Sequence, residues 1–531
     1  MRHFFKENLG YSFLPAWETI TNSKAYITGG RIMSHDQFDD AHYCGDLKTV
    51  IIERVRYELT ASDKDLVPEN ADAPLVVQAS LGADGFSDRD RHLVDKLTSF
   101  FSAGIIVTRV NDTVLDTCQS IGSLLTVAAA VGDKEEVVGP KLMSKLNSQI
   151  KEWTTVTQSG KPLKQVGEIG GRTVLIDIYL TFDEKFLSIM LGCANKHARL
   201  NFCWCVAGIT NPSNVCAKCN KSDSIILQPL QIPRQTDVLE VMKKDADNPS
   251  IAKLEGRSTT NLSPPVMDAL PFSNWVICPL HARINIVRNM WKFVRSVVNR
   301  PAELGTVAGG CENDPGNAAG EGDDRMDEQF LNLVFERTGL FLRTLDGWNG
   351  RECRNVIENM DTIVTVAVEL RRRIGNRLDP LRTIAEHVGR ALDIMAQVQL
   401  PARTSQEFRR LATELKTAAE EYATLWLRYF HKQPVEGVLF RPLLYDHLLV
   451  SHTHEHWVEC GGIGPLGDQV HEAVHPATRR NVKDHAPSDA RSKGEISRHI
   501  ILRQQQQAGA GNGYKPHGKT GKKRRKTTAE S

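Results

Sequence analysis

The sequence predicts an α/β protein whose sheet-forming part is followed by a large all-helical segment. Two apolar runs rich in β-branched residues, 75–83 and 173–180, have the composition of buried strands. Each run leads into an aspartate, Asp84 after the first and Asp183 after the second. Between residues 328 and 430, apolar side chains recur instead at the spacing of amphipathic helices. A carboxylate that follows a buried strand lies where open α/β sheets place catalytic and ligand-binding groups.

Shorter patterns predict the remaining elements. Residues 47–59 place apolar side chains at helical spacing, and the polar stretch 61–72 marks a boundary. A second strand is expected at 103–110, a helical or loop-like segment at 114–131, and a helix at 135–153. From Trp275 onward the pattern predicts an amphipathic helix.

These patterns divide the chain into seven regions. They are an N-terminal support or dimerisation segment (1–72), the first part of the sheet core with the cysteine pairs (73–224), a helical extension (225–300), a Gly- and Asp-rich linker expected to be disordered (301–327), a helical insertion (328–440), a region with paired histidines (441–500) and a disordered basic tail (501–531).

Composition narrows the class of protein. The chain has 531 residues, 41% of them hydrophobic and 24% charged, which is ordinary for a globular protein with a substantial core. No apolar stretch is long enough to span a bilayer and no secretory signal is recognisable, so we expect no membrane association. The net charge is +2, but residues 491–531 carry +9, which leaves −7 for the rest. The run Lys522-Lys523-Arg524-Arg525-Lys526 is typical of a nuclear-import signal or a nucleic-acid tether.

Two cysteine pairs and one histidine pair have the spacing of metal ligands. They are Cys203 and Cys205, Cys216 and Cys219, and His447 and His452. A structural Zn²⁺ takes four nitrogen or sulfur ligands, so the histidine pair with one cysteine pair would complete a site. The spacing leaves open which cysteine pair is used.

Six short motifs follow one another between residues 75 and 483. They are Ala83-Asp84-Gly85, Phe182-Asp183-Glu184-Lys185, the cysteine pairs, Pro279-Leu280-His281, His447-x4-His452, and Gly462-Ile463-Gly464 ahead of Glu472. In this order they resemble the RNase H-like transposases, and most closely the catalytic core of the V(D)J recombinase and the Transib transposases.

The resemblance implies an RNase H-like mixed sheet with a catalytic triad of Asp84 and Asp183 at strand ends and Glu472 on a helix. In such enzymes the three carboxylates hold two Mg²⁺ or Mn²⁺ ions for DNA cleavage and strand transfer. The resemblance further implies a zinc-stapled subdomain and an all-helical insertion between the second aspartate and the final glutamate. The implied partners are double-stranded DNA at transposon ends or recombination signals, a second copy of the chain, and an accessory protein subunit. The implied location is the nucleus.

Several alternatives stay open. Asp468 lies one helical turn before Glu472 on the same face and competes with it, as Asp177 competes with Asp183. No zinc-finger or helix-turn-helix pattern precedes the core, which favours a catalytically inactive, transposase-derived DNA-binding or nuclear scaffold protein. A third interpretation is a zinc-stabilised nuclear adaptor whose carboxylates are incidental.

Overall fold

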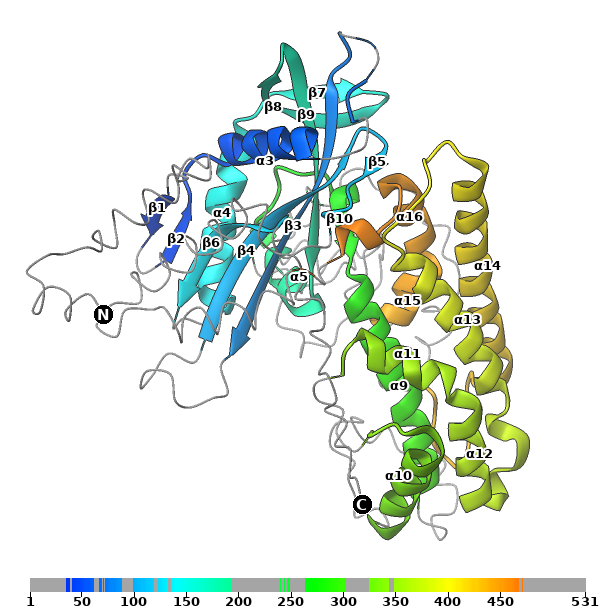
Figure 1. Ribbon diagram of the computed structural model, residues 1–531. Coiled ribbons are helices and arrows are strands. Elements are labelled where there is room, and N and C mark those ends of the chain that lie inside the picture. Colours follow the sequence, from blue (N-terminus) through cyan, green and yellow to red (C-terminus); the bar gives the residue numbers. More distant parts are fainter. Residues whose placement is uncertain are drawn as a thin grey trace, which may run out of the picture.

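The computed structural model combines one mixed β-sheet with a group of helices that extends away from it (Figure 1). It describes residues 35–38, 41–61, 66–68, 70, 72–87, 99–118, 123–131, 135–192, 263–300, 324–342, 348–467 and 470, and a few isolated positions between 239 and 248. Buried side chains of the sheet and of the helices form one continuous hydrophobic cluster.

The sheet has the strand order β1-β2-β6-β4-β3-β9-β8-β7, with β10 beside β9 and β5 beside β4. Its strands are β1 (His35–Phe38), β2 (Ala41–Cys44), β3 (Leu75–Ser87), β4 (Ser99–Val110), β5 (Thr113–Val114), β6 (Leu125–Val131), β7 (Thr155–Gln158), β8 (Lys161–Ile169), β9 (Arg172–Phe182) and β10 (Trp275–Ile277). The central strands β3 and β9 are parallel, and β10 continues this parallel arrangement beside the second half of β9. The other neighbouring strands of the sheet run antiparallel.

The two faces of the central strands differ in chemistry. Successive side chains of a strand point to opposite faces, so residues two apart share a face. On one face β3 buries Val77, Ala79, Leu81 and Ala83, and β9 buries Ile176, Ile178, Leu180 and Phe182. On the opposite face the same strands carry Gln78, Ser80, Asp177, Tyr179 and Thr181, all of them buried.

Helices α4 (Glu135–Lys151) and α5 (Glu184–Met190) cover the apolar face. The ring of Phe186 in α5 packs edge-on against Phe182, with ring centroids 5.2 Å apart, and tilts against Phe101 at 5.6 Å. Gly139 of α4 faces this ring so closely that an added Cβ would lie 2.5 Å from a ring carbon. The apolar side therefore supplies the packed core and leaves the polar side for the rest of the chain.

The remaining helices are α3 (Leu47–Ala61), which lies against β8 and β4, and the elements of the extended helical part. The latter are α9 (Pro279–Asn299), α10 (Asp324–Thr338), α11 (Gly350–Glu358), α12 (Met360–Leu370), η5 (Arg372–Leu378), α13 (Pro380–Met395), α14 (Gln406–Tyr429), α15 (Leu444–Ser451), α16 (Thr453–Cys460) and η6 (Gly464–Leu466). Figure 1 shows α9 leading from β10 at the sheet into this helical part.

Several sequence expectations are corrected. The segment 114–131 contains strand β6, because its small apolar residues pair with β4 on one side and β2 on the other. Trp275 begins a short strand beside β9, and the helix starts only at Pro279. Strand β3 continues past Asp84, because β4 pairs with it as far as Ser87. Helix α10 begins inside the expected linker, where Asp327 forms an ion pair of 2.5 Å with Arg295 of α9.

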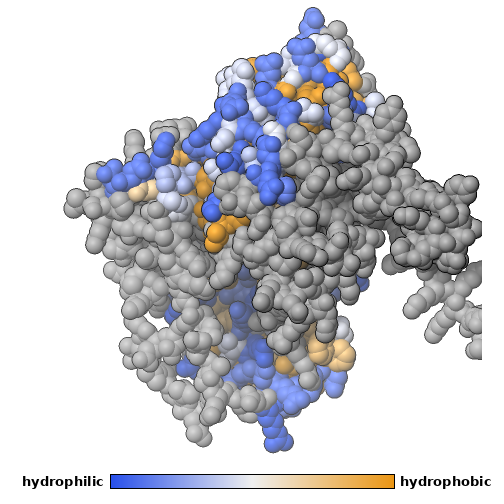
Figure 2. Space-filling view, turned by 90° about the vertical axis from the view of Figure 1, so that its left-hand side faces the viewer, coloured by the Kyte–Doolittle hydropathy of each residue, from blue (hydrophilic) through white to orange (hydrophobic). Residues whose placement is uncertain are grey.

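The surface of the described residues is mainly hydrophilic on the side seen in Figure 2, where hydrophobic side chains gather in only a few small patches. None of the helices in the described part of the chain is both long and apolar enough to cross a membrane.

Candidate active site

Asp84 and Asp183 lie on neighbouring parallel strands. The register of β3 and β9 ends with Gly82 opposite Thr181, so each aspartate lies two residues beyond this pair. Adjacent strands are about 4.8 Å apart, and continuing the register places the two aspartates side by side. Both are partly exposed, and Asp84 lies on the face of β3 that carries the buried polar side chains. Two candidate carboxylates far apart in sequence thus lie just beyond the paired part of two neighbouring strands, a place that we call the carboxylate edge.

Asp183 also begins helix α5. It has an extended backbone, and its Oδ1 accepts a hydrogen bond of 2.6 Å from the backbone N–H of Phe186. A side-chain oxygen at this position satisfies an N–H group that has no partner inside the helix. Capping occupies one of the two carboxylate oxygens.

The segment that follows α16 packs against the polar face of the sheet. The carbonyl oxygen of Leu466 accepts hydrogen bonds from the hydroxyls of Ser80, at 3.0 Å, and of Thr181, at 2.9 Å. These two hydroxyls also lie 3.0 Å from each other. Since Thr181 is two residues before Asp183, Leu466 is fixed near the carboxylate edge.

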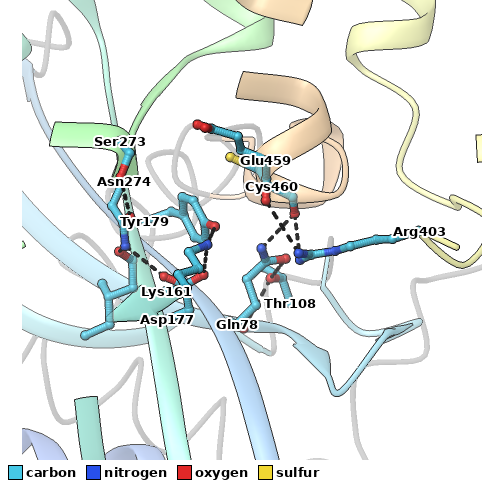
Figure 3. Close-up of polar contacts among 11 residues, drawn as sticks. Gln78, Thr108, Lys161, Asp177, Tyr179, Ser273, Asn274, Arg403, Glu459 and Cys460 are labelled. Carbon is cyan, nitrogen blue, oxygen red and sulfur yellow. Dashed lines mark hydrogen bonds and ion pairs between the residues drawn. The ribbon is translucent and has the colours of Figure 1, made fainter. Parts of the chain in front are cut away.

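The end of helix α16 is fixed to the same face through its carbonyl groups (Figure 3). Gln78 donates to the carbonyl of Cys460 at 2.8 Å, and Arg403 donates to it at 2.9 Å. Arg109 donates to the carbonyl of Gly461. Cationic side chains are stabilised at the carbonyl end of a helix, where the backbone dipoles leave partial negative charge. Burial and the nearby Arg403 lower the pKa of Arg109 to about 10, so the guanidinium remains charged at neutral pH.

Gly461 permits this close approach. Its φ of 71° lies in the left-handed region, which ends the helix. An added Cβ would lie 2.1 Å from Nε of Arg403 and 2.6 Å from Nη1 of Arg109. A larger residue would therefore both strain the backbone and push the two guanidinium groups away.

Asp177, the alternative to Asp183, is part of a buried network in the strand interior (Figure 3). Lys161 of β8 contacts its Oδ2 and the hydroxyl of Tyr179. Asn274 donates to its Oδ1 at 2.8 Å and to the carbonyl of Ile178 at 2.8 Å. With both oxygens used and 6% of the residue exposed, Asp177 holds strands together, which favours Asp183 as the metal-binding candidate.

The third carboxylate is outside the described residues, as is its rival: neither Glu472 nor Asp468 is placed. Val470, which lies two residues from each of them, is buried against Ile106 and Leu124. Ile106 pairs with Ser80 across β4 and β3 and shares its face. Val470 therefore lies over the polar face, as Leu466 does.

The predicted histidine pair comes together. His447 lies in α15, and His452 lies where α15 ends and α16 begins. Their Nε2 atoms are 3.2 Å apart, and Oγ of Ser451 is 3.3 Å from Nδ1 of His447. Tetrahedral zinc with Zn–N bonds of about 2.0–2.1 Å separates two ligand nitrogens by about 3.3 Å. Burial lowers the pKa of His452 to about 3, which leaves it neutral, the state that ligates metal.

The cysteine candidates, Cys203, Cys205, Cys216 and Cys219, also fall outside the described residues. Among the residues that the structure does describe, no three His, Cys, Asp or Glu side chains form a group that could hold a metal ion. The described residues therefore provide two candidate carboxylate ligands and, apart from them, two candidate histidine ligands.

Sequence reasoning missed the polar residues that lead to the carboxylates. At every second position, β3 carries Gln78, Ser80, Gly82 and Asp84. The same spacing in β9 and the residue after it gives Asp177, Tyr179, Thr181 and Asp183. This period-two pattern on an otherwise apolar background is a signal for a face that contacts polar groups. Arg109 and Arg403 had no such signal, because their partners are backbone carbonyls.

The contact at Leu466 predicts a coupled effect of two substitutions. Thr181→Val and Ser80→Ala each remove one donor, and each is expected to cost about 1 kcal/mol in the free energy of unfolding. The double variant leaves the buried carbonyl without both hydroxyls and should cost about 3 kcal/mol, more than the sum. Chemical denaturation of the four proteins measures this. Thr413→Val on the exposed side of α14 is the control, expected to change stability by less than about 0.5 kcal/mol; strictly additive effects would contradict a shared acceptor.

No model of a known protein family matches the chain, and no curated protein matches it.

Proposed function

We propose that this protein is a DNA transposase or recombinase-like nuclease that cleaves and joins DNA with two divalent metal ions. The observation that carries the proposal is the parallel pairing of β3 with β9, which ends at Gly82 and Thr181, two residues before Asp84 and Asp183. In RNase H-like enzymes the first aspartate lies on the first core strand and the second at the end of a later strand parallel to it. The arrangement of β3 and β9 agrees with that pattern, and we propose an RNase H-like core.

The third ligand is proposed to be Glu472. Its chain is fixed over the polar face at Leu466 and at Val470. Asp468 lies as many residues before Val470 as Glu472 lies after it, so it stays the alternative ligand. In the related enzymes the final glutamate comes from a helix laid over the sheet.

The donor set fits hard divalent cations. Carboxylate oxygens are the protein ligands that Mg²⁺ and Mn²⁺ prefer, and two or three of them suffice because the ions keep several waters. A pair of such ions supplies activation of water or a 3′-hydroxyl and stabilisation of the leaving oxygen. The residues of this chain contribute by holding the carboxylates in place: β3 and β9 fix two of them, and the Ser80–Thr181 contact fixes the approach of the third.

A structural zinc is proposed at His447 and His452, completed by one of the two cysteine pairs. The 3.2 Å separation of their Nε2 atoms supports this assignment, because it equals the spacing of two nitrogens on one tetrahedral ion. Zinc here would tie the region before η6 to the region after β9, the two parts of the chain on either side of the helical insertion. The substrate is proposed to be double-stranded DNA in the nucleus, with the enzyme acting as a dimer.

A catalytically inactive, DNA-binding protein is the second candidate. The observation that favours it is the capping role of Asp183, which gives this carboxylate a structural reason to be present. In that case the pairing with Asp84 would be incidental.

The test is cleavage of DNA with Mn²⁺. The protein is expected to nick supercoiled DNA, and Asp84→Ala is expected to lower the rate at least about hundredfold, the equivalent of about 3 kcal/mol of transition-state stabilisation. Asp112→Ala is the matched control, because this exposed aspartate lies in the turn after β4, at the opposite end of β3 from Asp84. Equal rates for the parent and Asp84→Ala would remove Asp84 from the site.

A further inference from the structure

A group of five arginines gathers at the end of α9 that points away from the sheet. We call it the arginine cluster: Arg300, Arg371, Arg372, Arg373 and Arg377. Arg373 and Arg377 share one carboxylate, Glu436. Arg371 donates to the carbonyl of Val298 at 2.8 Å, and Arg373 donates to that of Arg300 at 3.2 Å. Arg300 in turn donates to the carbonyl of Gly437 at 2.7 Å. These contacts join four of the arginines, and Arg372 lies between two of them in the chain.

In the described part of the chain, the cations of the arginine cluster outnumber the carboxylates that they contact. Five guanidinium groups face a single carboxylate within these contacts, since the other acceptors are neutral backbone carbonyls. Glu369, the acidic residue that precedes the cluster, is paired with Arg337 at 2.6 Å. A guanidinium has five N–H donors, so even the arginines with a structural contact keep donors for a ligand.

Arg372 differs from the other four arginines in its contacts with the described residues. Within the described part of the chain its exposed side chain makes no hydrogen bond or ion pair, whereas its four neighbours fasten helix ends and the loop that carries Glu436. Among the described residues, no carboxylate therefore stabilises its charge, and cations flank it. A phosphate-bearing ligand is the kind of partner that such an arrangement stabilises.

The cluster lies at a defined distance from the carboxylate edge. Cys278, the N-cap of α9, directly follows the pair of Ile277 with Phe182, so the helix begins level with Asp183. It spans 21 residues, which is about 31 Å at 1.5 Å per residue. Figure 1 shows α9 running from the sheet to the far part of the helical region. At 3.4 Å per base pair, this is the length of about nine base pairs of duplex.

We propose that the arginine cluster binds the phosphate backbone of double-stranded DNA about nine base pairs from the phosphodiester held at Asp84 and Asp183. This inference rests on the proposed nuclease function, and it assigns to the helical insertion a role in holding the DNA that flanks the reaction. Guanidinium–phosphate contacts carry no sequence information, so the contact adds affinity for any sequence and fixes the direction of the duplex.

Binding is tested with the full chain, a 30-base-pair fluorescent duplex and no divalent metal, between 50 and 200 mM salt. Loss of one phosphate contact lowers affinity about eightfold at 0.1 M salt and reduces the slope of log K against log salt by about 0.9. Arg372→Ala is expected to show both effects. The full chain is needed because residues 301–323, outside the described residues, add five carboxylates and no basic side chain directly after Arg300.

Arg409→Ala is the matched control. Arg409 is an exposed arginine on α14, a helix with four basic and four acidic residues, and its removal should leave the salt slope unchanged. Equal slopes for the parent and Arg372→Ala, or equal losses in both variants, would overturn the proposal. Because no metal is present, the binding result is independent of cleavage. If Arg372→Ala changes the salt slope but the protein does not nick DNA, the cluster binds DNA and the nuclease proposal is rejected. If the protein nicks DNA but the slope is unchanged in Arg372→Ala, the nuclease proposal stands and the cluster proposal is rejected.

Discussion

Asp183→Asn is expected to abolish metal-dependent cleavage of DNA while leaving the free energy of unfolding nearly unchanged. Asparagine caps a helix about as well as aspartate, so the hydrogen bond to the N–H of Phe186 can be kept. An amide lacks the charge that draws a divalent cation, and the lost stabilisation should lower the cleavage rate at least about hundredfold. Nicking rates, Mn²⁺ binding by titration calorimetry and chemical denaturation together measure the three quantities.

Asp183→Ala separates the two roles of this carboxylate. It removes the cap as well as the charge, so it should lose the same activity and, in addition, about 1 kcal/mol of stability. If Asp183→Asn cleaved DNA and bound Mn²⁺ like the parent, Asp183 would be a helix cap only, and the inactive DNA-binding interpretation would be preferred. The comparison is informative because both substitutions are at one position and differ only in what remains.

His452→Ala is expected to lose the bound zinc and a large part of the stability of the region around α15 and α16. Structural zinc contributes binding free energy of about 10–16 kcal/mol in small domains, so removing one of four ligands should cost several kcal/mol. For a domain of this size, that is a fall in melting temperature of about 5–10 °C. Elemental analysis should find one zinc per parent chain and none in the variant, and chelation of the parent should reproduce the lower melting temperature.

His454→Ala and His452→Cys are the controls for the zinc assignment. His454 lies in the first turn of α16, and in the described residues no contact joins it to the two facing Nε2 atoms, so its removal should leave the zinc content at one. A cysteine at 452 can replace the imidazole as a ligand and should keep the metal. Zinc retained by His452→Ala, or lost equally in His454→Ala, would reject the pair His447 and His452 as the ligands.

The parts of the fold that the sequence could predict are those with a local signal. The runs at 75–83 and 173–180 became β3 and β9, and the helical stripes became α13 and α14, because burial on one side leaves a period of 2 or 3.6 in the chain itself. The pairing of His447 with His452 also has a local origin, because the two residues are only five apart in the chain, on either side of the end of α15.

Such local signals do not predict which strands pair with each other. β10 is three residues long, too short for a periodic signal, and it pairs with β9, which is far away in the sequence. The small residues of β6 favour a helix locally, and pairing with β4 and β2 overrides that preference. The side-by-side position of Asp84 and Asp183 depends on the same kind of pairing, so the sequence could suggest two strand ends but not their register.

The polar face of the sheet holds the segment after α16 almost entirely by main-chain oxygens, those of Cys460, Gly461 and Leu466. Every amino acid provides the same carbonyl group, so substitution of residues 460 and 466 by residues of similar volume should keep these hydrogen bonds. The strand side has no such freedom, because only certain side chains donate. Distant relatives are therefore best sought through the spaced letters Gln-x-Ser-x-Gly-x-Asp of β3, and an alignment scored over the later segment would be expected to miss them.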